Sequence, residues 1–212
     1  MHTRSDGNTG GRLHAGPIGT RRLRLVPLGV AHAGEMAEVL ADPALHEFVG
    51  GRPLSPDALR ARYERLVAGS PDPAESWCNW VVRARDTGGL VGTVQATVRN
   101  AGTGPAGAVV REAEVAWVVG TRRQGQGIAS EAAVALVGWL RARGVATVVA
   151  HVHPDHRASG AVAAAAGLAP TARWQDGEVR WEWRSGAPGD EGPAGHDSPD
   201  GFRAPGTKSE GC

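Results

Sequence analysis

The sequence predicts a mixed α/β domain in which helices pack on a β-sheet. Strand-like and helix-like segments follow one another along residues 20–184 as one strand, two helices, three strands, one helix, one strand, one helix and two strands. Residues 146–152 are almost all apolar, which is typical of a central strand covered on both faces. The ends of the chain, 1–19 and 185–212, instead hold 12 of the 31 glycines. We expect both ends to be disordered tails with one domain between them.

Local signals place the elements of the first half of this domain. Ser55 is suited to cap a helix, because its hydroxyl can accept a hydrogen bond from the first turn and Pro56 fits the first helical position. An Asp-Thr-Gly-Gly turn at residues 86–89 separates two β-rich segments and predicts a hairpin. The expected elements are strands at 21–28, 76–84 and 90–98 and helices at 31–41 and 55–68.

Periodicity and glycine positions place the elements of the second half. Apolar residues recur at helical spacing along residues 125–143, and Gly144 is placed to end that helix. A glycine-rich loop is expected at 101–107 and a tight turn at Asp176-Gly177. The expected elements are strands at 111–119, 146–152, 168–174 and 178–184 and helices at 125–143 and 157–166.

The composition excludes several classes of protein. The formal net charge of +1 gives no footprint for a nucleic-acid partner, and no apolar run approaches the roughly 20 residues of a membrane span. No signal peptide is evident at the N-terminus. Two cysteines, Cys78 and Cys212, do not make a disulfide framework. A cytoplasmic location is therefore expected. The only lysine is Lys208, which removes Schiff-base, pyridoxal and P-loop-lysine chemistry from the domain.

The strongest chemical signal is the loop at residues 120–129, Gly-Thr-Arg-Arg-Gln-Gly-Gln-Gly-Ile-Ala, between a strand and a long helix. Gly125 and Gly127 let the backbone approach a ligand closely, and the first N–H groups of a helix have no partner within it. Together with the helix dipole they form an anion site suited to a pyrophosphate, to which Arg122 and Arg123 add positive charge. A glycine turn with two solvated arginines would give the same pattern without a ligand. The loop has neither the Gly-Lys-Ser/Thr of a Walker loop nor the G-x-G-x-x-G of a dinucleotide fold.

The pattern Arg122-x-x-Gly125-x-Gly127 resembles motif A of the GNAT superfamily of acyl-CoA-dependent N-acyltransferases. The stretch from His156 to Ser159, followed by Gly167-Leu168, is similar to the N-x-x-S … G-F segment of that family, and the order of elements also matches. The resemblance implies a mixed, mostly antiparallel sheet of about six to seven strands with about four helices on its faces. It also implies an N-acetyltransferase that transfers an acetyl group from acetyl-CoA to a primary amine.

The resemblance further implies where CoA binds. The backbone of the loop would hold the pyrophosphate, and the end of strand 111–119 would pair with the pantetheine arm in a splayed gap beside strand 146–152. His156 stands where the family has an asparagine that contacts the pantetheine. The cofactor-binding residues so implied are Val118, Val119, Arg122, Arg123, Gln124, Gly125, Gln126, Gly127, Ile128, Ala129 and His156.

Two residues are candidates for proton transfer. Glu114 shares one face of strand 111–119 with Ala116 and Val118 and is the predicted base toward the amine, although an ion pair with an arginine is the alternative. Many members of the family use a tyrosine as the acid toward the CoA thiolate, but the only tyrosine here is Tyr63, far from that region. Ser159 is the hydroxyl at the right place, and its alternative role is that of a helix N-terminal residue.

The acceptor is expected to be a small-molecule amine, because no extra surface for a macromolecule is evident; protein N-termini remain open. Candidate acceptor contacts are two aromatic and two amide side chains, each of which could equally serve packing or a cross-strand hydrogen bond. They are Trp77, Trp117, Asn79 and Gln95. The alternatives are another acyl donor (a longer acyl-CoA or an aminoacyl-tRNA) and a non-catalytic acyl-CoA-binding module. A monomer or homodimer is expected.

A competing motif lies at residues 151–156, which spell H-x-H-x-D-H, the ligand run of metallo-β-lactamase-fold hydrolases. Two zinc ions would need further ligands later in the chain, and only His196 follows, in the expected tail. We therefore expect no metal.

Overall fold

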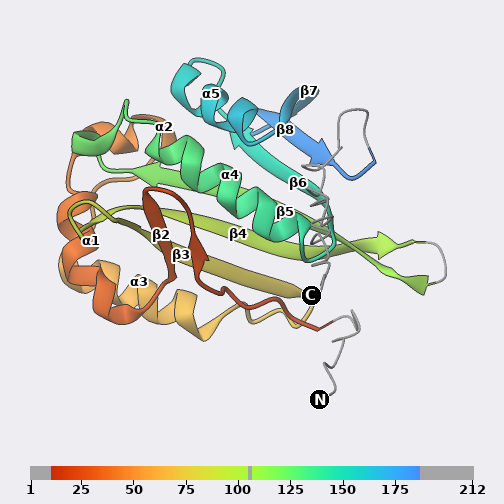
Figure 1. Cartoon of the computed structure of the whole chain (residues 1–212), viewed down its shortest axis with the longest axis horizontal. Coiled ribbons are helices and arrows are strands. Elements are labelled where there is room, and N and C mark those ends of the chain that lie inside the picture. Colours follow the sequence, from red (N-terminus) through yellow and green to blue (C-terminus); the bar gives the residue numbers. More distant parts are fainter. Residues whose placement is uncertain (1–10, 105–106, 187–212) are drawn as a thin grey trace, which may run out of the picture.

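A computed structural model describes residues 11–104 and 107–186 (Figure 1). The tails expected at 1–19 and 185–212 lie outside the described residues except for 11–19 and 185–186. The strands are β1 (Ile18–Gly19), β2 (Leu23–Pro27), β3 (Glu75–Ala84), β4 (Leu90–Thr103), β5 (Val109–Val119), β6 (Val145–Val152), β7 (Ala169–Gln175) and β8 (Glu178–Arg184). The helices are α1 (Ala33–Val39), α2 (His46–Val49), α3 (Pro56–Ala68), α4 (Ile128–Arg141) and α5 (Arg157–Ala165), with short 3₁₀ turns η1 (Val30–His32), η2 (Pro43–Leu45) and η4 (Thr121–Arg123).

The strands form one sheet of eight in the order β1-β2-β3-β4-β5-β6-β8-β7. All neighbours are antiparallel except β5 and β6, which are parallel. The predicted mixed, mostly antiparallel fold is therefore confirmed, with one strand more than the six to seven expected. The additional strand is β1, which has only two residues and belongs to a segment whose composition predicts a tail.

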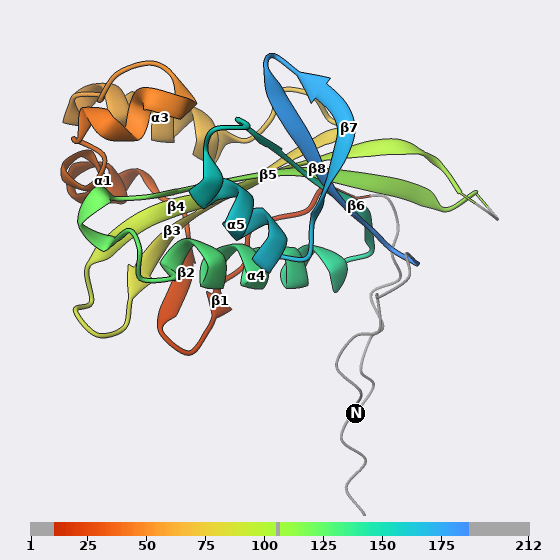
Figure 2. The same ribbon diagram turned by 90° about the horizontal axis from the view of Figure 1, so that it is seen from above.

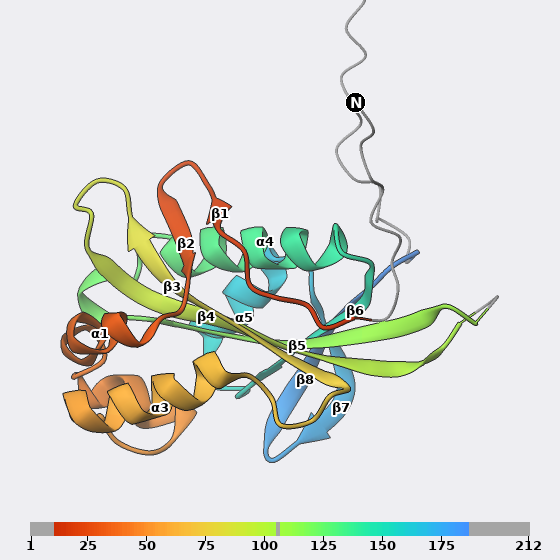
Figure 3. The ribbon, with the colours of Figure 1, turned by 90° about the horizontal axis from the view of Figure 1, so that it is seen from below.

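Helices cover the two faces of the sheet unequally (Figures 2 and 3). One face packs against α4 and α5 and forms the larger core, in which Trp80 is fully buried and meets Trp139 edge to face at 5.0 Å between ring centroids. The opposite face is covered at one end by α1 and α3, whose buried residues include Met36, Leu59 and Tyr63. The β7–β8 hairpin bends toward that same side in both figures.

Residues 11–19 differ most from the sequence-based expectation, because they lie along the sheet instead of in a tail. The Leu13 amide donates to Ser76 Oγ at 3.0 Å, and the indole N–H of Trp80 donates to the Gly16 carbonyl at 2.7 Å. The segment supplies backbone partners to buried polar groups more than it supplies apolar area. The amino-acid composition of a segment does not show whether its backbone will form hydrogen bonds with buried side chains, so it did not predict this role.

The glycine-rich loop expected at 101–107 is also shorter than predicted. Strand β4 continues to Thr103, which pairs with Val109 of β5, with a shift in register between Asn100 and Gly102. Pairing with β5 keeps the backbone extended despite the glycines. No helix in the described part of the chain is long and apolar enough to cross a membrane.

Candidate active site

Strands β5 and β6 separate partway along their length. Their parallel pairing runs from Arg111 opposite Val145 to Glu114 opposite Val149. Strand β5 nevertheless continues to Val119, and β6 continues to Val152 while still paired with β8. Five residues at the end of β5 therefore have no partner on this side, and the sheet opens there.

A cavity of about 560 Å³ fills this opening, and we call it the splay cavity. Its walls come from the end of β5, the loop before α4, the first turn of α5 and η2. The lining residues used below are Leu45, Trp117, Val118, Val119, Arg123, Gln124, Gly125, Gly127, Ile128, Ala129, His156 and Ser159. Nine of the eleven predicted cofactor-binding residues are among them, and the other two, Arg122 and Gln126, line neither this cavity nor the second one described below.

The glycines of the loop adopt conformations that other residues rarely take. Gly125 has φ of 70° and Gly127 has φ of 71°, both in the left-handed region. Gly127 is the N-cap of α4 and no side chain caps the helix, so the first N–H groups of α4 are left to a ligand or water. This is the arrangement of an anion-binding helix N-terminus.

A hydrogen-bond network from the turn between β1 and β2 braces the loop and the start of α4. Glu131, in the first turn of α4, accepts hydrogen bonds from Thr20 Oγ1 at 2.6 Å, the Arg22 amide at 2.8 Å and Arg22 Nε at 2.6 Å. The same guanidinium donates to the Gln126 carbonyl at 2.8 Å. Burial alone would raise the pKa of Glu131, but the hydrogen bonds from Thr20 and Arg22 outweigh it and lower the pKa. Sequence analysis missed this brace, because its members lie more than 100 positions apart.

The side chains of the loop are themselves held in place. Arg123 donates to both carboxylate oxygens of Asp86, at 3.1 and 3.0 Å, while its Nε is buried without a partner. Gln124 Nε2 donates to the Val119 carbonyl at 3.0 Å. These contacts fix the loop against β5 and the β3–β4 turn.

The first turn of α5 forms the opposite wall of the splay cavity. His156 is the N-cap, and its Nδ1 accepts from the Ser159 amide at 3.4 Å, so a neutral ring carries its proton on Nε2. Burial, followed by the charge of His153, lowers the pKa of His156, which favours the neutral ring at pH 7. Ser159, the predicted acid, lines the same cavity.

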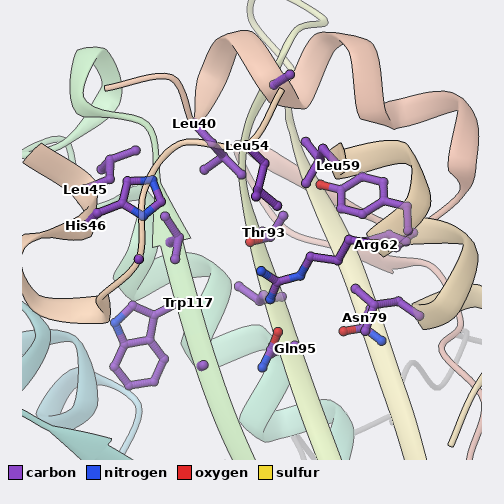
Figure 4. A pocket seen from close by; sticks show the side chains of 18 of the residues that line it. Leu40, Leu45, His46, Leu54, Leu59, Arg62, Asn79, Thr93, Gln95 and Trp117 are labelled. Carbon is purple, nitrogen blue, oxygen red and sulfur yellow. The ribbon is translucent and has the colours of Figure 1, made fainter. Parts of the chain in front are cut away.

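A second cavity, of about 510 Å³, lies on the face of the sheet under α3, and we call it the α3 cavity (Figure 4). It shares Leu45, Trp117 and Val118 with the splay cavity, so the two meet at the end of β5. The predicted acceptor residues Asn79, Gln95 and Trp117 line it, and Asn79 and Gln95 lie opposite each other on β3 and β4.

Two predicted site residues lie away from both cavities. Glu114 lines neither; its Oε1 lies 3.2 Å from His151 Nδ1 and its Oε2 lies 3.7 Å from an Arg99 nitrogen, which corresponds to the ion-pair alternative. Trp77 also lines neither cavity, and its indole N–H donates to Glu75. Alternation along a strand gives the face of a residue but does not show where along the strand a cavity lies.

Five polar residues of the α3 cavity were not predicted: His46, Arg52, Arg62, Tyr63 and Thr93. His46 Nδ1 lies 3.2 Å from the Gly50 carbonyl oxygen, so a neutral ring that donates to it keeps a lone pair on Nε2, which is buried and has no partner among the described residues. The helical spacing of Leu59, Tyr63 and Leu66 was the available signal for the cavity wall. Among the described residues, no group of three or more His, Cys, Asp or Glu side chains is arranged to hold a metal ion.

Comparison with known proteins shows which family has this architecture. The family model described as the acetyltransferase (GNAT) domain matches residues 22–169. No curated protein matches the sequence. Among solved structures, RimL, a ribosomal L7/L12 alpha-N-protein acetyltransferase in complex with coenzyme A, is 17% identical, with 80% of this chain and 98% of that chain covered and a TM-score of 0.61.

Two further structures share the fold at similar identity. A GNAT-family acetyltransferase from Bacillus anthracis is 16% identical over 80% of this chain and 98% of that chain, with a TM-score of 0.60. An acetyl transferase from Salmonella typhimurium, which modifies the N-terminal serine of 50S ribosomal subunit protein L7/L12, is 16% identical over 80% of this chain and 99% of that chain, with a TM-score of 0.59. The family match covers well over half of the sequence, and the chain therefore belongs to the GNAT family of acetyltransferases.

Proposed function

We propose that the protein transfers an acetyl group from acetyl-CoA to a primary amine. The observation that carries this proposal is the separation of β5 from β6, with a cavity in the opening that runs from a glycine-rich helix N-terminus to the start of α5. A phosphate-containing, elongated cofactor suits such a site, because backbone N–H groups lie at one end and an open strand edge lies along the middle.

The proposal gives each wall of the splay cavity a task. The backbone from Arg123 to Ala129 binds the pyrophosphate, and the guanidinium of Arg122 adds charge from the exposed side of the loop. The end of β5 around Val118 and Val119, which has no partner strand on the β6 side, pairs with the amides of the pantetheine arm. His156, with a proton on Nε2, replaces the asparagine of the family as a hydrogen-bond donor to that arm.

The reaction needs a neutral amine. Its lone pair attacks the thioester carbonyl carbon, the C–S bond breaks, the CoA thiolate takes a proton and the amine loses one. Glu114 is the base predicted from the sequence, acting on the amine through water, and His46, which lines the α3 cavity next to the shared Leu45, is a second candidate. Ser159 is proposed to donate toward the thiolate, a step that water can also perform.

The acceptor is proposed to be a small-molecule amine bound in the α3 cavity, with Asn79, Gln95 and Trp117 among its contacts. The volume of that cavity lies within the range of small-molecule sites, about 300–1,000 Å³. The solved relatives that act on a ribosomal protein make a protein N-terminus the alternative acceptor. A cytoplasmic monomer or homodimer without a nucleic-acid partner remains the expected setting.

Replacement of Gly125 tests the CoA site directly. A valine there would be forced into the left-handed region at a cost of about 1–3 kcal/mol, so the loop would shift and acetyl-CoA affinity measured by calorimetry should fall at least about tenfold. Gly177, with φ of 83° in the β7–β8 turn, is the matched control, and Gly177→Val should bind acetyl-CoA normally.

Two results would contradict the proposal. Equal affinity of Gly125→Val and wild type for acetyl-CoA would remove the pyrophosphate from this loop. Tight binding of acetyl-CoA without thiol release in the presence of a broad set of amines and peptides would favour the non-catalytic binding module.

A further inference from the structure

The α3 cavity is positively charged. Among the described residues, the charged side chains that line it are Arg52 and Arg62, and no carboxylate does. The guanidinium of Arg62 points into the cavity toward Thr93 and Gln95 (Figure 4). Neither arginine has an ion-pair partner among residues 11–104 and 107–186. An arginine that enters a cavity without a carboxylate partner is available to bind an anion.

A buried donor beside Arg62 supports the same conclusion. Tyr63 is 3% exposed, lines the cavity and has no hydrogen-bond partner for its hydroxyl in the described structure. Burial raises the pKa of Tyr63 to about 12 although the charge of Arg62 opposes the shift, so the phenol keeps its proton at neutral pH. A buried hydroxyl without a partner is costly, and a ligand oxygen would satisfy it.

The rest of the cavity constrains the shape of the ligand. Leucine side chains form much of its wall, and those labelled in Figure 4 are Leu40, Leu45, Leu54 and Leu59. On the sheet side the polar groups are those of Thr93 and of the neighbours Asn79 and Gln95. The α3 cavity meets the splay cavity at Trp117 and Val118. A ligand with an apolar spacer between two polar ends fits this distribution of polar and apolar residues in the cavity wall.

We propose that the amine acceptor carries an anionic group, a carboxylate or a phosphate, which Arg62 binds inside the α3 cavity. The inference rests on the proposed function, since it takes the junction at Trp117 as the place where the amine meets the thioester. Arg62 contributes a charge-assisted hydrogen bond, Tyr63 a neutral one, and the leucines contact an aliphatic spacer. Arg62 is thus a specificity-determining residue, and the substrate class is an amino carboxylate or amino phosphate instead of a polyamine or an amino sugar.

Matched acceptors test this preference. One arm compares ω-amino carboxylates and ω-amino phosphates of increasing length with amino alcohols of the same length. A second arm compares short peptides that have glutamate or glutamine after an N-terminal serine, which separates a free metabolite from an acidic protein N-terminus. We expect kcat/KM to favour the anionic member by about tenfold or more, and the preference to weaken as salt is added.

Variants on α3 assign the preference to Arg62. Arg62→Gln should abolish it, chiefly through KM of the acceptor, while the KM of acetyl-CoA stays unchanged; Arg62→Lys should restore part of it. Arg60 is exposed on the same helix and lines neither cavity, so Arg60→Gln is the matched control and should behave like wild type.

Direct binding keeps this test separate from that of the proposed function. Calorimetry with each carboxylate and its alcohol, on protein loaded with CoA, should give binding of the carboxylate by wild type and Arg60→Gln but not by Arg62→Gln. Absence of that binding, or equal turnover of charged and uncharged amines, would overturn the inference. Binding that depends on Arg62 without acetylation of any amine would instead contradict the proposed function and leave an anion-binding α3 cavity.

Discussion

At the scale of single residues, two side chains are candidates for the general base, and they differ in their surroundings. Glu114 lies on the correct face of β5 but is engaged with His151 and Arg99, away from both cavities. His46 lines the α3 cavity beside Leu45, and its Nδ1 contact with the Gly50 carbonyl leaves a lone pair on Nε2. A base must come within hydrogen-bond reach of the proton that it removes, directly or through one water.

We therefore expect His46→Gln to lower kcat more than Glu114→Gln does. Loss of a general base typically costs about 10²–10⁴-fold, and the glutamine amide can still donate to the Gly50 carbonyl, which preserves the local fold. The measurement is kcat against pH for both variants, with acetyl-CoA affinity as the control for folding. A large loss confined to Glu114→Gln would return the role of base to that carboxylate.

At the scale of elements, one carboxylate links the start of α4 to the turn between β1 and β2. Glu131 ties the first turn of that helix to Thr20 and Arg22, and the same arginine reaches the carbonyl of Gln126. The helix N-terminus that is proposed to bind pyrophosphate is thus oriented from the turn between β1 and β2. A change in Glu131 should affect both stability and CoA affinity without altering any residue that lines the splay cavity.

Glu131→Gln should lower the free energy of unfolding at pH 7 by about 1.5–3 kcal/mol, the usual contribution of a hydrogen bond to a charged group, and should weaken acetyl-CoA binding. The pKa of Glu131 is lower in the folded state than in the unfolded state, where it is about 4.3. Its stabilisation is therefore complete above about pH 4.3 and disappears as the pH falls through the folded-state pKa. Urea unfolding of both proteins at neutral and acidic pH measures this; a difference that persists at low pH would contradict the assignment.

The elements also show how far the sequence can be interpreted alone. Helices at 55–68 and 125–143 and the hairpin of 76–98 were predictable because caps, turns and periodicity are local signals, and the structure has α3, α4 and β3–β4 there. The glycine-rich loop before α4 was predictable for the same reason. The brace at Glu131 and the lining of the α3 cavity were not, since both bring together residues from distant segments. Trp77 was named as an acceptor contact because it is an aromatic residue on a strand, a pattern that does not show how far the α3 cavity extends along β3.

At the scale of the whole molecule, the segment before β2 is part of the domain. Arg12 donates to the carbonyls of Ser70 and Asp72, and the Gly16 carbonyl satisfies the buried indole of Trp80. Leu13 and Ala15 pack against the larger core. The domain boundary therefore lies at or before residue 11, earlier than the residue 20 expected from composition.

Removal of residues 1–16 should consequently destabilise the protein. The Trp80 indole N–H would lose its partner inside the core, which costs about 1–3 kcal/mol, and the contacts of Leu13 would be lost as well. Chemical unfolding compares this truncation with one that removes only residues 1–10, which should match the full chain. Identical midpoints for both truncations would mean that the segment contributes nothing to stability.

The hydrogen bonds between Arg22 and Glu131 also matter for any transfer of the loop into another protein. Arg22 and Glu131 are 109 positions apart, so the loop is oriented only after the start and the middle of the chain have met. A fragment from β5 to β8 would contain every residue of the loop and still lack the hydrogen bonds that aim its helix. Grafts, split-protein designs and circular permutants of this enzyme should therefore treat residues 20–22 as part of the CoA site, although they touch neither cavity.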